Sequence, residues 1–116
     1  MIWLWLSAAV MVLTALLHSI FGERRLIVPL LAVDSEITRR LHVQRLIRLC
    51  WHLISVQMIL SAVVVVWPGT PRALIGITGG IWVFAGIADL VATRGKHIGW
   101  PPLSAAGLFA LLGAIA

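Results

Sequence analysis

The feature that most constrains this fold is a first apolar stretch without a single charge. Ile2 to Phe21 contains no Asp, Glu, Lys or Arg. A helix of this length rises about 30 Å, which matches the hydrocarbon core of a bilayer. Trp3 and Trp5 stand at its start, where indole rings favour the membrane interface. We therefore expect a first transmembrane helix at residues 2–21, retained rather than cleaved as a signal peptide.

The composition indicates the same class of protein. Hydrophobic residues make up 61% of the 116 residues and charged residues 11%, whereas about 25% of a soluble protein is charged. Four apolar helices joined by short connections use the whole chain. The sequence predicts one domain, residues 1–116, that is an all-α integral membrane bundle with transmembrane helices at about 2–21, 46–67, 73–93 and 98–116.

The segment between the first two helices is mixed in character. Residues 23–34 are polar at both ends, and their apolar middle contains Pro29. This apolar run is too short to span, so we expect an interfacial segment that lies on the bilayer. Asp34 or Ser35 is suited to cap the next helix. That second helix is then unusually long, and its first turns stand outside the lipid.

The basic residues predict the orientation. The net charge is +5, but the basic residues flank apolar stretches instead of forming one soluble face, so we expect no nucleic-acid partner. They indicate lipid-headgroup contacts and, by the positive-inside rule, termini outside the cytosol of a bacterial-type inner membrane. The residues concerned are Arg24, Arg25, Arg39, Arg40, Arg45, Arg48, Arg94 and Lys96.

Small residues recur along the last two helices. Gly76 and Gly80 are four residues apart, with Gly79 beside them, and Ala106, Ala110 and Ala114 repeat at the same spacing. Such ladders allow helix backbones to approach closely in a membrane. Packing within the chain is the favoured interpretation, and a homodimer interface is the alternative.

The ionisable residues in or near the spans fall at one predicted membrane depth. A charge that faces lipid costs at least ~2.5 kcal/mol on insertion scales, so these side chains should face other helices or water. The candidate site residues are three histidines, His18, His52 and His97, and four charged residues, Glu23, Arg45, Arg48 and Asp89.

Three interpretations of this group stay open. In the first it is structural, with Asp89 paired to an arginine of the second helix, most simply Arg48, and Glu23 paired to another arginine. In the second, the histidines bind haem or a transition metal, with His18 and His52 facing each other as the best pair. In the third, arginines and histidines bind an anionic lipid headgroup, a quinone or a small anion.

No residue pattern identifies a reaction, so the sequence leaves open whether the chain is an enzyme. With no soluble domain, we expect a subunit of a membrane assembly or a small oligomer, with the bilayer and other protein chains as partners. The alternative is a stand-alone transporter or channel driven by proton or anion binding at the same residues.

Overall fold

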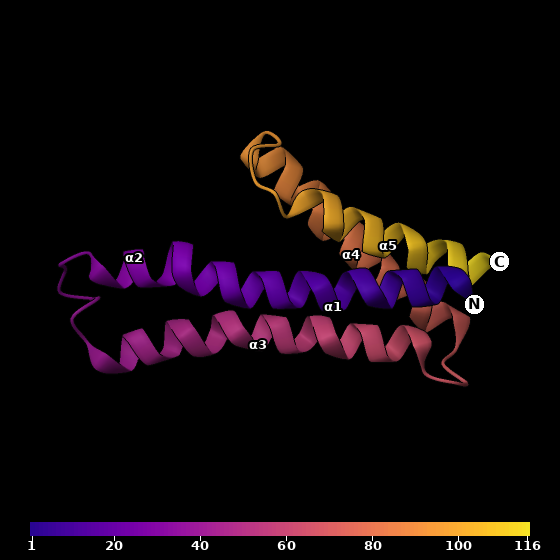
Figure 1. The fold of residues 1–116 in the computed structure, drawn as a ribbon, viewed down its shortest axis with the longest axis horizontal. Helices are drawn as coiled ribbons and strands as arrows, with labels where there is room; N and C mark the ends of the chain where they lie inside the picture. Colours follow the sequence, from indigo (N-terminus) through magenta and orange to yellow (C-terminus); the bar gives the residue numbers. More distant parts are fainter.

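The computed structural model describes all 116 residues, and every regular element is helical. The elements are α1 (Ile2–Gly22), η1 (Glu23–Ile27), α2 (Val28–Ala32), α3 (Leu41–Val66), α4 (Arg72–Thr93) and α5 (Trp100–Ile115). Because α1, η1 and α2 follow without a break, the chain forms four helices that run back and forth. Both termini therefore lie at the same end of the molecule (Figure 1).

Three of these helices are long and apolar enough to cross a membrane: Ile2–Ala32, Leu41–Val66 and Arg72–Thr93. The fourth, Trp100–Ile115, is shorter and equally apolar in character. The predicted all-α fold of four helices is confirmed, with small shifts at the boundaries.

The expected interfacial segment at 23–34 is instead a continuation of the first helix. The N–H of Val28 bonds to the carbonyl of Glu23, five residues back, which is the spacing of a π-helix. This wider turn directly precedes Pro29, whose ring would clash with the preceding turn of a regular α-helix. The π-helical turn thus lets the helix pass through a proline that the sequence suggested would break it.

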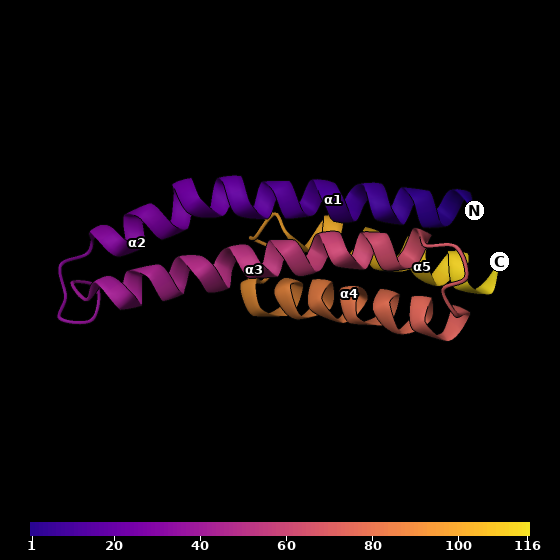
Figure 2. The ribbon, with the colours of Figure 1, turned by 90° about the horizontal axis from the view of Figure 1, so that it is seen from below.

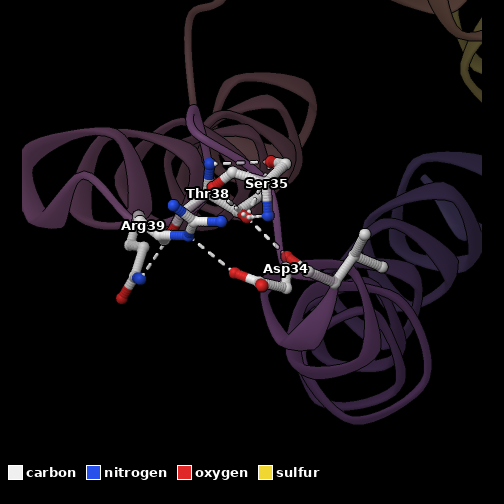
Figure 3. A network of polar contacts seen from close by, with 6 residues as sticks. Asp34, Ser35, Thr38 and Arg39 are labelled. Carbon is white, nitrogen blue, oxygen red and sulfur yellow. Dashed lines mark hydrogen bonds and ion pairs between the residues drawn. The ribbon is translucent and has the colours of Figure 1, made fainter.

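The second helix begins at Leu41 and not at Ser35. Ser35 and Thr38 each accept the other's backbone N–H through their hydroxyls, and Arg39 Nε donates to Asp34 Oδ1 at 2.6 Å (Figure 3). Short polar side chains that bond nearby backbone groups compete with helix formation. The expected capping residues are therefore used to build the turn between α2 and α3.

The helices pack in a defined order. α1 lies against both α3 and α5, and α4 packs mainly on α5, whereas α3 and α4 touch little. The α4–α5 backbones approach closely at Gly79, where an added Cβ would stand 2.9 Å from the Gly107 carbonyl oxygen. Ser7 Oγ donates to the Ala106 carbonyl at 2.7 Å and joins α1 to α5.

The small residues of α4 and α5 differ in what they pack against. Ala106 and Ala110 are fully buried, as expected for packing within the chain. An added Cβ at Gly76 or Gly80 would meet nothing within 4 Å. The prediction of packing within the chain is therefore confirmed for Gly79, which faces α5, and wrong for Gly76 and Gly80.

The α1–α3 hairpin is longer than the α4–α5 pair. At 1.5 Å per residue, the helix from Ile2 to Ala32 is about 46 Å long and α4 about 33 Å. The hairpin projects past the connection between α4 and α5 (Figure 2), and the α4–α5 pair diverges from α1 toward that connection (Figure 1). The site described next lies at this divergence.

Candidate functional site: a histidine relay beside a cavity

Polar side chains of α1, η1 and α3 form one continuous hydrogen-bonded chain. Glu23 Oε2 lies 3.3 Å from His52 Nε2, and His52 Nδ1 lies 2.9 Å from Ser19 Oγ. Ser19 Oγ lies 2.6 Å from Ser55 Oγ, which lies 2.9 Å from His18 Nδ1. We call these five residues the relay cluster.

Helical spacing explains why they meet. Residues three or four apart share one helix face, and this holds for Ser19 and Glu23 on one side and for His52 and Ser55 on the other. His18 and His52 thus share the α1–α3 interface, but they meet through two hydroxyls and do not face each other directly.

The directions of the bonds define where the hydrogens lie. Ser19 donates to Ser55, and a hydroxyl has only one hydrogen. His52 Nδ1 must therefore carry a hydrogen and donate it to Ser19. Its Nε2 then brings a hydrogen to Glu23 only when the imidazole holds two protons, as an ion pair with the carboxylate.

Glu23 is anchored from two sides. Arg48 Nε donates to Glu23 Oε1 at 2.7 Å, while Oε2 faces His52. Glu23 is paired with an arginine, as expected, but its partner is Arg48, which was expected to pair with Asp89. Arg45, one turn earlier on α3, is exposed and makes no ion pair. The polar side chains of α3 that face α1 therefore begin at Arg48.

Trp51 fixes the inner end of the relay cluster. Its indole stacks on the His18 ring, with centroids 4.2 Å apart and planes at 9°. Trp51 Nε1 also donates to the His18 carbonyl at 2.8 Å. The indole lies against Gly22, where an added Cβ would overlap its Nε1. Glycine is therefore required at this contact.

The predicted pairing of Asp89 with Arg48 is wrong. Asp89 accepts from His97 Nδ1 at 2.8 Å, and Arg48 is bonded to Glu23. The reason is the packing order, because α4 packs on α5 and has little contact with α3. The Asp89–His97 pair instead ties the end of α4 to the connection before α5.

A cavity of about 440 Å³ lies between α1, α3 and the start of α5, within the usual range for ligand pockets. Leu17, Met58 and Leu103 contribute apolar walls, and His18 and Trp51 also line it. The inner end of the relay cluster therefore opens onto this cavity.

Three basic side chains line the same cavity: Arg25 from η1, and Lys96 and His97 from the α4–α5 connection. The Arg25 guanidinium also lies 4.8 Å from the centre of the Phe21 ring, a cation–π contact. Residues that are 71 positions apart in sequence, Arg25 and Lys96, are thus gathered at one opening.

The three histidines do not form one ligand set. His18 and His97 line the cavity, whereas His52 does not. His18 and His52 each place Nδ1 on a serine hydroxyl, and no group of three or more His, Cys, Asp or Glu side chains is placed to hold a metal ion. The geometry therefore lends the metal interpretation no support.

Several site residues were not singled out from the sequence. Ser19 precedes Glu23 by four residues, and this spacing was the available signal. Trp51 and Gly22 carry no charged or metal-ligating group, so nothing in the sequence indicated that they belong to the site. Arg25 and Lys96 were expected to indicate topology and to contact lipid headgroups, but nothing in the sequence indicates that they line one cavity.

No protein-family model, curated protein or solved structure matches the chain.

Proposed function

We propose that this chain is a small polytopic membrane protein, acting as a subunit or small oligomer of a membrane assembly, whose relay cluster carries protons between the cytosolic surface and the cavity. The observation that carries the proposal is the unbroken hydrogen-bonded path from Glu23 to His18.

Exposed apolar side chains support the membrane location. Only 17 of 116 residues are buried, and large apolar side chains such as Leu16, Val56 and Phe84 are more than half exposed, at 51%, 57% and 73%. Soluble monomers rarely expose an apolar surface this extensive. With the arginine-rich α1–α3 connection in the cytosol, both termini lie outside, and Glu23 faces the cytosolic side.

Each member of the relay cluster can accept one hydrogen and pass on another. In the proposed step, His52 releases its Nδ1 proton to Ser19, Ser19 passes its own hydrogen to Ser55, and Ser55 passes its hydrogen to Nδ1 of His18. His52 holds the extra proton because its Nε2 has first taken one from water beside Glu23, and after the transfer His52 is neutral with its hydrogen on Nε2. The charge moves from His52 to His18, and no other bond changes.

The charges around His18 bear on this step. His18 is connected to His52 of α3 through the hydroxyls of Ser55 and Ser19. Three other basic side chains line the cavity together with His18: Arg25 of η1, and Lys96 and His97 of the α4–α5 connection. These groups are basic, so a proton arriving at His18 is favoured when an anion occupies the cavity. Glu23 is fully engaged by Arg48 and His52, which leaves the cavity as the place for a ligand.

Trp51 provides a reporter for the test, since a charged imidazole stacked on an indole quenches its fluorescence. Protein in nanodiscs is exposed to a rapid drop in pH, and the difference between wild type and Trp51→Phe isolates the Trp51 signal. We expect Ser19→Ala and Ser55→Ala to slow the Trp51 response roughly tenfold or more, as removal of a proton-transfer group does in catalysis.

His42 on α3 is exposed and lies outside the relay cluster, so His42→Ala is the control and should leave the response unchanged. Equal response rates in wild type and both serine variants would refute the proton path. Proton flux through the pure chain in liposomes, abolished by Ser55→Ala, would favour the stand-alone transporter over the subunit.

A further inference from the structure

The cavity beside His18 combines apolar walls with an unpaired positive edge. Its apolar lining includes Leu17, Phe21, Leu26, Met58 and Leu103. Arg25 and Lys96 are exposed at its rim. A cavity of this kind matches a ligand with an apolar body and a charged head.

The chain itself does not neutralise this edge. Its four acidic side chains are all engaged by other residues, in the pairs Asp34–Arg39, Glu36–Arg40, Glu23–Arg48 and Asp89–His97. Arg25 and Lys96 make no ion pair, although they come from distant segments and line one cavity. An anion from outside the chain is the partner that this arrangement lacks.

We propose that the cavity binds a single-chain amphiphile with an anionic head, whose carboxylate or phosphate lies between Arg25 and Lys96 and whose chain lies along the apolar wall. Arginine and lysine both bind such heads through charge-assisted hydrogen bonds. Basic pockets between transmembrane helices on the cytosolic side are typical sites for anionic lipid-like molecules.

The volume favours one chain over two. About 440 Å³ lies near the lower end of the range for pockets that enclose small ligands. The aromatic edge formed by Trp51, stacked on His18, ends the apolar wall next to the relay cluster. The inference names the ligand class for the cavity that the proposed proton path reaches, and it rests on the proposed membrane location.

The experiment uses ω-bromododecanoate, whose bromine quenches a contacting indole, added to full-length protein in nanodiscs of uncharged phosphatidylcholine. Trp51 quenching is again isolated against Trp51→Phe. The variant carrying Arg25→Gln and Lys96→Gln should raise the half-quenching concentration at least roughly tenfold, because two charge-assisted contacts are lost.

The matched control carries Arg24→Gln and Arg94→Gln. These two exposed arginines lie close in sequence to Arg25 and Lys96, make no ion pair and do not line the cavity. Both double variants remove two positive charges, so they have the same net charge. The control should bind ω-bromododecanoate like wild type. Uncharged ω-bromododecanol should quench more weakly, and the Arg25 and Lys96 substitutions should not change its quenching.

Equal loss of binding in both double variants, or equal quenching by the acid and the alcohol, would overturn the proposal. Competition by dodecyl phosphate and by dodecanoate distinguishes the two head groups, and displacement by either supports the anionic head. Displacement by two-chain phosphatidylglycerol alone would overturn the single-chain assignment. Charge-dependent binding with an unchanged pH-jump response in Ser19→Ala would leave this inference intact and refute only the proton path.

Discussion

Gly22 controls how closely α3 approaches α1 beside the relay cluster. It lets the Trp51 indole lie against the α1 backbone, stack on His18 and donate to the His18 carbonyl. Any side chain at position 22 would occupy the space of that indole. The absence of a side chain at Gly22 therefore allows the inner end of the relay cluster to form.

We expect Gly22→Ala to lower the free energy of unfolding in detergent by about 1–3 kcal/mol, the usual cost of overpacking. The Trp51 fluorescence should change with it, because the indole must leave its stack. The matched control is Gly80→Ala, where the added methyl meets open space and no loss is expected. Equal stability of the two variants would contradict the close contact.

The elements differ in how far the sequence determined them. Long apolar runs predicted the number of helices, because a single apolar segment of that length satisfies its backbone hydrogen bonds inside a bilayer as a helix. The path through Pro29 was not predictable by the same reasoning, since it depends on a π-helical turn that an apolar pattern does not reveal. The start at Leu41 was missed because Ser35 and Thr38 bond each other and so form a turn instead of a cap.

The continuous first helix can be measured directly. With spin labels at positions 6 and 30, in a Cys50→Ser background that removes the one native thiol, the separation along a straight helix is about 36 Å. A segment that bends to lie on the bilayer after position 22 would shorten it to about 27 Å. Pulsed electron resonance separates the two values, and the shorter distance would restore the interfacial segment.

At the scale of the whole molecule, the order of helix packing decided which site residues meet. Matching depth correctly suggested that His18 and His52 lie in one interface. Depth cannot say which helices are neighbours, so it wrongly paired Asp89 with Arg48. The cavity depends on the same packing order, because α1, η1, α3 and the α4–α5 connection all contribute to its lining.

The orientation of the molecule sets the compartment from which protons arrive. The arginines of the α1–α3 connection predict that both termini lie outside the cytosol. An alkaline phosphatase fused to the C-terminus should be active, and a fluorescent protein that matures only in the cytosol should stay dark. The opposite pair of results would place Glu23 on the outer surface and reverse the direction of the proposed path.

The most direct measurement of the proton path is the nitrogen NMR spectrum of the histidine rings in nanodiscs. Glu23→Gln should shift the ring signals of His52, its direct partner, and of His18, reached through Ser19 and Ser55. Adding Ser19→Ala should keep the shift at His52 and remove it at His18, while exposed His42 stays unchanged throughout. The relay would be contradicted if Glu23→Gln left the His18 ring signals unchanged, or if it shifted them equally in the presence and absence of Ser19→Ala.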